Sequence, residues 1–405
     1  MRIPEHMSTR SYWHKTDVVI QSARSVLSGD GDGLRKSLAR ALEDIHEPEV
    51  DWREFERLAD HHAVTPLFAH GLLQFGGDLV PQEVRAKLQE RLQLIARNNL
   101  RWLAEWCRLM TAFEASGIPV IPLKGPIFAV QVYGNLALRE FADLDFMVQP
   151  HDVLCARDVL AAEGYRPRFT FGANGDEMLL RSGNRQLEFV NRDRGMQIDL
   201  HWNALHTMFP FQLPVNDQFR TSQPAHYEGT QFLSLSPEHT LLYLCGHGTK
   251  HYWFRLRWLC DLARFVQSAV DLDWGIAAAM AENGKCVLMV RHSLLLAKAT
   301  LGLDLPPQAG SFSEDRRAQA LADLAHSFLF RTRVNPSLTE EMRYHLAFAK
   351  GWRDRLHYLH HRILAPAEPD WSAMRLPQPL HPLYYFVRPA RFIFERLSSS
   401  GPRSG

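Results

Sequence analysis

The chain lacks an excess of charge of either sign. Over 405 residues, 46 Lys plus Arg stand against 45 Asp plus Glu, which gives a formal net charge of +1. Proteins that hold long nucleic acids across a broad surface need clustered cations to neutralise phosphates. The balance therefore disfavours a long nucleic acid as partner, and the ordinary composition, 46% hydrophobic and 22% charged, favours a globular protein.

Cysteines are few, and none has C-x-x-C spacing. An odd count of five disfavours both a disulfide framework and a zinc site built on cysteine, so we expect free thiols in a reducing compartment. Long apolar runs are also missing. No stretch approaches the roughly 18 residues that span a bilayer, and the N-terminus has no apolar core of a secretory signal. We therefore expect a cytoplasmic protein with no integral membrane segment.

The pattern of apolar and turn residues changes three times along the chain, which predicts four regions. Residues 1–33 are predicted to be an irregular N-terminal segment, and residues 34–116 a helical region with apolar residues three or four apart. Residues 117–235 alternate short strands with helices, and residues 236–405 are predicted to be helical again. The predicted fold class is α+β, with a small mixed sheet between helical regions.

Turn residues mark the predicted strands of the central part. Ile118 to Leu123 and Leu144 to Val148 are apolar runs typical of strands, and Gly125-Pro126 opens a helix between them. Arg185 to Val190 and Met196 to Trp202 are predicted to pair as a hairpin across a polar loop.

The second of these strands carries two carboxylates on one face. Because side chains alternate along a strand, Asp143 and Asp145 point one way, while Leu144 and Phe146 point the other. Asp199 and His201 repeat this pattern on the last strand. If the two strands are neighbours, three carboxylates converge, and such a set can hold two Mg²⁺ ions for an in-line phosphoryl displacement.

A phosphate site is expected close by in the sequence. Lys124-Gly125-Pro126 places a cation and a glycine at the start of a helix, where free N–H groups and the helix dipole favour an anion. Arg139 adds a planar guanidinium that suits phosphate oxygens. Lys124, Gly125 and Arg139 are therefore the candidate nucleotide-binding residues.

These features together resemble the signature of the DNA polymerase β nucleotidyltransferase superfamily, a glycine turn followed by an Asp-x-Asp strand and a later acidic strand. More closely, they resemble a bacterial family of uncharacterised nucleotidyltransferases. Its members share a Leu-Lys-Gly turn, a Tyr-Gly pair, an arginine before Asp-x-Asp, and an Asp-Leu-His-Trp strand. The matching residues are Leu123-Lys124-Gly125, Tyr133-Gly134, Arg139, Asp143, Asp145 and Asp199 to Trp202.

The resemblance spans most of residues 34–270, and it implies a polymerase β-like core. Two departures from the wider superfamily are the Lys-Gly-Pro turn, where Gly-Ser or Gly-Gly is common, and a longer interval from the turn to Asp143. The resemblance implies transfer of a nucleoside monophosphate from an NTP to an acceptor, with release of pyrophosphate.

On that resemblance, Asp143, Asp145 and Asp199 are the predicted catalytic and metal-binding residues. The implied cofactor is Mg²⁺, for which Mn²⁺ is an expected substitute, and ATP is the expected nucleotide. The acceptor stays open among a small molecule, a sugar, a peptide and a protein.

Several alternatives stay open at this stage. The chain could be an inactive regulatory protein that binds nucleotide, or a metal-dependent hydrolase that uses His247, His251 and Asp261. His201 could act behind a metal-binding carboxylate or make a structural hydrogen bond. Arg139 could instead form an ion pair with a neighbouring acid, Asp143 or Glu140.

Overall fold

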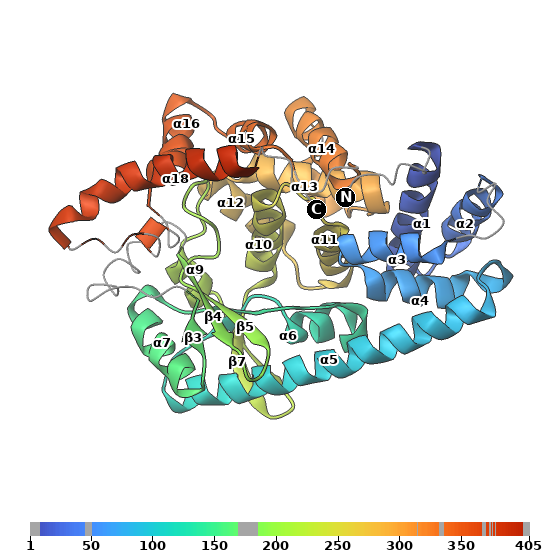
Figure 1. Cartoon of the computed structure of the whole chain (residues 1–405), viewed down its shortest axis with the longest axis horizontal. Helices are drawn as coiled ribbons and strands as arrows, with labels where there is room; N and C mark the ends of the chain where they lie inside the picture. The colour runs from blue at the N-terminus through green and yellow to red at the C-terminus, as the bar shows by residue number, and fades with distance from the viewer. Residues whose placement is uncertain are drawn as a thin grey trace. The chain divides into compact units, whose positions relative to one another are not determined.

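The computed structural model describes residues 9–44, 51–168, 185–313, 315–331, 336–366, 370–371, 374, 376 and 378–399. The chain forms two compact units, each assembled from separate stretches of sequence. Unit 1 contains Met1–Trp106, Lys124–Phe141 and Ser236–Ala347, and unit 2 contains Cys107–Leu123, Ala142–Leu235 and Phe348–Gly405. Figure 1 labels their elements.

The described residues of unit 1 form helices joined by turns and loops, with no strand among them. The long helix α5, Gln82–Ala115, begins in this unit and ends in unit 2. The other helices of unit 1 are α1 Thr9–Ser28, α2 Asp32–Asp44, α3 Trp52–His61, α4 Thr65–Phe75, α6 Pro126–Phe128, α10 Pro237–Lys250, α11 Leu256–Ser268, α12 Trp274–Asn283, α13 Val287–Leu301, α14 Arg316–Leu329 and α15 Leu338–Leu346. Its short 3-10 or π turns are η1 Gly77–Leu79, η2 Ala129–Tyr133, η3 Leu136–Leu138 and η5 Pro307–Phe312.

Helix α1 corrects the prediction of an irregular segment over residues 1–33 for Thr9–Ser28, while residues 1–8 lie outside the described residues. Val18, Val19 and Ala23 are fully buried on one stripe of this helix, which packs against α2 and α4. Buried serines interrupt the stripe in the sequence, and the hydroxyl of Ser22 donates to the carbonyl of Val18 at 2.7 Å. Because the serine is satisfied within its own helix, it can be buried, and the amphipathic pattern is harder to see.

Unit 2 is built around a five-stranded mixed sheet in the order β1-β2-β5-β4-β3. β2 and β5 are parallel, and the other neighbours are antiparallel. The strands are β1 Ile121–Pro122, β2 Leu144–Met147, β3 Arg166–Pro167, β4 Gln186–Asn191 and β5 Met196–His201, with a separate hairpin of β6 Gln223–Tyr227 and β7 Thr230–Ser234. The helices and turns are η4 Pro150–Asp152, α7 Val153–Ala162, α9 Val215–Arg220, α16 Trp352–Leu359, η6 His360–Leu364, η7 Gln378–Leu383 and α18 Tyr384–Ser399.

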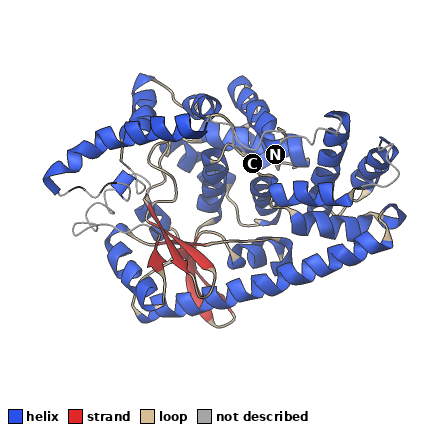
Figure 2. Ribbon diagram, in the orientation of Figure 1, coloured by secondary structure: helices blue, strands red, loops and turns tan. Residues whose placement is uncertain are grey.

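One face of the sheet forms the core of unit 2. Leu144, Phe146, Ile198 and Leu200 alternate with polar residues along β2 and β5, and each is at most 1% exposed. The ring of Phe113, from α5, meets Phe146 edge to face with centroids 5.6 Å apart. Figure 2 shows the strands as a small group among helices. The predicted α+β class with a small mixed sheet is therefore confirmed.

The turns that bound these elements follow the expected chemistry. Gly195 has a φ of 64° in the loop between β4 and β5, a backbone conformation that glycine adopts at little cost. Ser236 caps α10 by accepting the N–H of His239, with Pro237 in the first turn. No helix in the described ranges is both long and apolar enough to cross a bilayer.

Candidate metal centre

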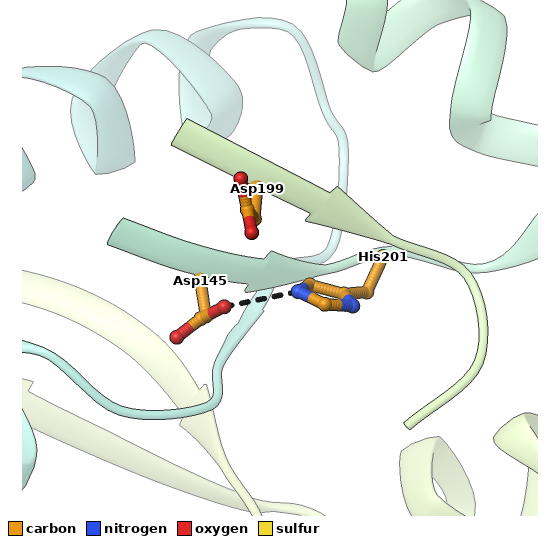
Figure 3. Close-up of side chains that lie close together, drawn as sticks. All are labelled: Asp145, Asp199 and His201. Carbon is orange, nitrogen blue, oxygen red and sulfur yellow. Dashed lines mark hydrogen bonds and ion pairs between the residues drawn. The ribbon is translucent and has the colours of Figure 1, made fainter. Parts of the chain in front are cut away.

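The parallel pairing of β2 with β5 brings the two acidic strands together. Asp145 lies opposite Asp199 in the register, and Met147 lies opposite His201. Figure 3 shows Asp145, Asp199 and His201 projecting from these neighbouring strands toward one another. The hypothesis that the two acidic strands are neighbours is confirmed.

These three residues form the acidic cluster: Asp145, Asp199 and His201. Within the part of the chain that the structure describes, they are the one group of acidic, histidine or cysteine side chains placed to share a metal ion. One ligand atom from each lies within 4.8 Å of the others. The Nε2 atom of His201 is 3.0 Å from Oδ1 of Asp145, a hydrogen bond that joins the two strands.

Two glutamines hold the carboxylate of Asp199. The Nε2 amide of Gln186 donates to Oδ2 at 2.8 Å, and that of Gln197 donates to Oδ1 at 3.3 Å. Neither glutamine was among the candidates from the sequence. A signal was present for Gln197, which is two residues before Asp199 and so shares its face of β5. Gln186 comes from β4, and only the pairing register shows that it is close.

Burial and like charge dominate the electrostatics of the cluster. Burial raises the pKa of Asp199 to about 8, and the carboxylates of Asp145 and Asp143 add to the effect. Since two carboxylates close together resist ionising at once, Asp199 holds a proton at neutral pH unless a cation takes its place. Such a site gains most from a bound cation.

Asp143 lies just before β2 and is half-buried. It is not among the three residues whose ligand atoms converge, but its charge acts on Asp199. Its predicted role as a metal ligand stays a prediction.

The donor set of the cluster fits a divalent cation. Carboxylate oxygens suit Mg²⁺ and Mn²⁺, and an imidazole nitrogen also suits Mn²⁺ and other transition metals. His201 either donates its Nε2 proton to Asp145, which orients that carboxylate, or presents the nitrogen to the ion. Either arrangement is compatible with the distances among Asp145, Asp199 and His201.

The predicted phosphate turn has an unusual backbone. Gly125 has φ 79° and ψ −148°, a region that essentially only glycine occupies, and Pro126 follows at the start of α6. The N–H of Leu123, two residues earlier, donates to the carbonyl of Asp145 at 3.0 Å, so the turn follows directly from the edge of the sheet. Lys124 is buried, and its Nζ lies 5.1 Å from the centroid of the Tyr243 ring.

Arg139 forms an ion pair inside unit 1 with Asp261. Its Nε and Nη2 atoms donate to the two carboxylate oxygens at 2.8 and 3.0 Å, and the hydroxyl of Tyr133 donates to the same carboxylate at 2.9 Å. Burial opposes ionisation of Asp261, but Arg139 keeps its pKa below the ordinary value. Asp261 was not among the acids considered for Arg139 from the sequence, which were Asp143 and Glu140.

His247, in α10, and His251, which directly follows α10, form an aromatic group with Trp258 of α11. The ring of His251 stacks on that of Trp258 at 4.9 Å, and the ring of His247 lies 4.9 Å from His251. Burial and the charge of Lys124 hold the pKa of His247 well below its usual range. With Asp261 engaged by Arg139, the described side chains around these histidines offer no metal site for the hydrolase alternative.

One protein-family model matches the chain, over residues 48–302, and its description is "uncharacterised nucleotidyltransferase". No curated protein and no solved structure matches the chain. The matched span contains the turn at Gly125, both acidic strands and the helices from α3 to α13. A converging acidic cluster on paired strands, in a chain matched over more than half its length, leads to one conclusion: the chain belongs to the family of uncharacterised nucleotidyltransferases.

Proposed function

We propose that the protein transfers a nucleoside monophosphate from an NTP, with ATP as the expected donor, to an acceptor, and that pyrophosphate leaves. The observation that carries this proposal is the register of β2 and β5, which places Asp145 opposite Asp199 with His201 beside them. In the reaction an acceptor oxygen bonds to the α-phosphorus, the bond from that phosphorus to pyrophosphate breaks, and the acceptor releases its proton.

The acidic cluster would hold Mg²⁺, or Mn²⁺ in its place. Asp145 and Asp199 are the proposed ligands, Asp143 the proposed third carboxylate, and His201 orients Asp145. When bound, the cation would stabilise the negative charge that develops on the phosphate in transfer. Gln186 and Gln197 keep the Asp199 carboxylate in one orientation, so the site is positioned before a ligand arrives.

Lys124 and Gly125 are the proposed contacts to the triphosphate. Gly125 has no side chain, so a phosphate could approach the backbone closely before α6, and the lysine supplies a cation. Arg139 was predicted to join them, and its ion pair with Asp261 offers a competing structural role. The five free thiols suit a reducing compartment, and we propose the cytoplasm.

The decisive experiment is pyrophosphate release from each of the four NTPs with Mg²⁺ or Mn²⁺, with and without a cell extract as a source of acceptor. We expect release by the wild type and a loss of at least about 100-fold in Asp145→Asn and Asp199→Asn, since metal-dependent charge stabilisation supplies several kcal/mol. Asp193→Asn, in the exposed loop after β4, is the matched control and should keep full activity.

Full release by either cluster variant would refute the assignment. Nucleotide binding without any release would instead indicate a regulatory protein that keeps the fold but not the transfer reaction.

A further inference from the structure

A cavity of about 530 Å³ lies in unit 2 at the carboxyl ends of the parallel strands β2 and β5. Pro150, after β2, and Trp202, after β5, both line it. Its size falls in the range of pockets that hold small organic molecules. Trp202 directly follows His201 in the chain, so consecutive residues belong to the acidic cluster and to the cavity wall.

The inner walls of this cavity are apolar and firmly packed. Trp202, Phe209 and Leu213 line it and are each at most 5% exposed. The rings of Phe209 and Phe211 stack at 4.7 Å with 9° between their planes, and Phe348 packs edge-on against Phe211 at 6.2 Å. These walls suit the body of a partly apolar ligand.

The rim is polar and contains no carboxylate among the described lining residues. Amides, imidazoles and one guanidinium surround the opening, supplied by Asn203, Gln212, Asn216, His206, His357 and Arg185. A cationic ligand would find no counter-charge there, whereas an anionic group would find hydrogen-bond donors and a cation.

Two buried nitrogen atoms on the lining residues lack partners in the described structure. Trp202 is 1% exposed, and its Nε1–H has no acceptor; the Nδ1 atom of His361 is also without a hydrogen bond. Both nitrogens belong to residues of the cavity wall, but each is itself inaccessible to solvent, so neither identifies the ligand.

Hydrogen bonds to the backbone also hold two of the lining residues, Arg185 and His206. Arg185 has a φ of 52°, a left-handed conformation uncommon for a residue with a side chain, and its carbonyl accepts the N–H of Trp202 at 2.9 Å. The Nδ1 atom of His206 accepts the N–H of Met208 at 3.0 Å. The ring proton of neutral His206 is therefore on Nε2.

We propose that this cavity binds the acceptor substrate, a small organic molecule with an apolar body and an oxyanion group, either carboxylate or phosphate. The body lies against Trp202, Phe209 and Leu213, and the oxyanion meets the amides and the guanidinium of the rim. The acceptor role rests on the proposed nucleotidyl transfer, whereas binding of such a molecule follows from the cavity itself.

The first test is binding of simple probes to the full chain, without metal or nucleotide, measured by saturation-transfer NMR and calorimetry. The probes are benzoate, phenyl phosphate and, as the cationic counterpart, benzylamine. Either or both anions should bind at millimolar concentration, and benzylamine at least tenfold more weakly. The anion that binds more tightly identifies the group as carboxylate or phosphate.

A charge change at the exposed rim residue Gln212 makes this test specific. Gln212→Glu should weaken anion binding about fivefold and Gln212→Lys should strengthen it, since one charge at a few ångströms in water contributes about 1 kcal/mol. Gln223→Glu, on exposed β6 of the same unit and outside the lining, should change nothing. Tighter binding of benzylamine than of either anion, or an unchanged affinity in Gln212→Glu, would overturn the proposal.

The acceptor role is tested by pyrophosphate release with extract in Gln212→Trp, which narrows the cavity. We expect half-maximal release to need at least ten times more extract, with NTP binding unchanged. If release depends on Asp145 but not on Gln212→Trp, the acceptor binds elsewhere and this inference fails while the proposed function stands. If the probes bind but release never depends on Asp145, the proposed function fails, and the acceptor role fails with it.

Discussion

Asp199 couples metal binding to pH through one carboxyl group. Its pKa of about 8 means that a cation must displace a proton at neutral pH. We expect the apparent affinity for Mn²⁺ to fall about tenfold for each pH unit below 8 and to level off above it. Calorimetry in buffers of different ionisation enthalpy should detect the release of nearly one proton per ion at pH 7.

The same carboxyl sets the sign of a stability effect in the metal-free protein. In the folded protein the pKa of Asp199 is raised from the ordinary 3.8 to about 8. Protonated Asp199 therefore contributes its full stabilisation below pH 3.8, and that stabilisation is lost as the pH rises through 8. Asp199→Asn should remove the pH dependence of both the Mn²⁺ affinity and the stability, and Asp193→Asn should keep both. A metal affinity that is flat from pH 6.5 to 9 in the wild type would contradict this account.

The ion pair of Arg139 with Asp261 decides between two roles for the arginine. Both side chains are at most 4% exposed, so loss of one leaves the other charge buried and unpaired. Arg139→Met should cost about 3–5 kcal/mol, and much of that cost should return in Arg139→Met/Asp261→Leu. Urea unfolding of the single and double variants measures the coupling.

A coupling below about 0.5 kcal/mol would show that the pair does little for stability. Nucleotide affinity in Asp261→Asn then separates the roles. An affinity lost in Arg139→Met but kept in Asp261→Asn would support the predicted phosphate contact.

At the scale of elements, the turn before α6 depends on a glycine. Because Gly125 has φ 79° and ψ −148°, we expect Gly125→Ala to cost about 1–3 kcal/mol and to weaken NTP binding. Gly134→Asn is the control, since Gly134 has an ordinary left-handed conformation with open space around it, which asparagine tolerates. Thermal unfolding and nucleotide titration report the two effects; equal stability of the two variants would argue against strain at the turn.

Helix α10 contains a glycine whose replacement should reverse the usual preference. A Cβ on Gly248 would lie 2.4 Å from carbon atoms of the buried Trp253 ring. Alanine normally favours a helix over glycine by about 1 kcal/mol, but here overpacking should destabilise unit 1 by about 1–3 kcal/mol. Gly310→Ala, where a Cβ meets nothing within 4 Å, is the matched control, and chemical denaturation compares them. A stabilised Gly248→Ala would refute the packing argument.

Local patterns in the sequence predict much of the secondary structure and of the faces of the strands. Alternation along β2 and β5 predicts an acidic face and an apolar face, and Ser236-Pro237 predicts the start of α10. Gly246 and Gly248 lie inside α10, but Trp253 packs on Gly248, and the helix is unbroken. That compensation comes from a tertiary contact, which periodicity does not contain.

Partners distant in sequence were the part that the sequence did not predict. Arg139 and Asp261 are joined by a hydrogen bond across 122 positions, and Gln186 reaches Asp199 through the register of β4. The residue types show which side chains could pair with each charged group, but only the fold determines which of them is close enough to do so. For the same reason the sequence placed His201 on the right face without showing that it completes the cluster.

For the whole molecule, bound ligands should raise the unfolding temperature. A ligand that binds only the folded state at 100 times its Kd adds about 2.7 kcal/mol of stability. We expect ATP with Mg²⁺ or Mn²⁺ to raise the Tm of the wild type, and EDTA to reverse most of the rise. Asp145→Asn should lose the metal-dependent part, and an equal shift in that variant would show that the ion binds elsewhere.

The interleaving of the two units has a consequence for the order of events during synthesis. Unit 2 takes its sheet from residues before 235, but His357 and His361 of the cavity wall come from the stretch after 348. Between them, the ribosome makes the last stretch of unit 1, Ser236–Ala347. A nascent chain therefore carries the residues of the acidic cluster more than a hundred residues before it has a complete cavity, so a translation product cut short in that interval would contain carboxylates that bind a cation but no finished place for the second substrate.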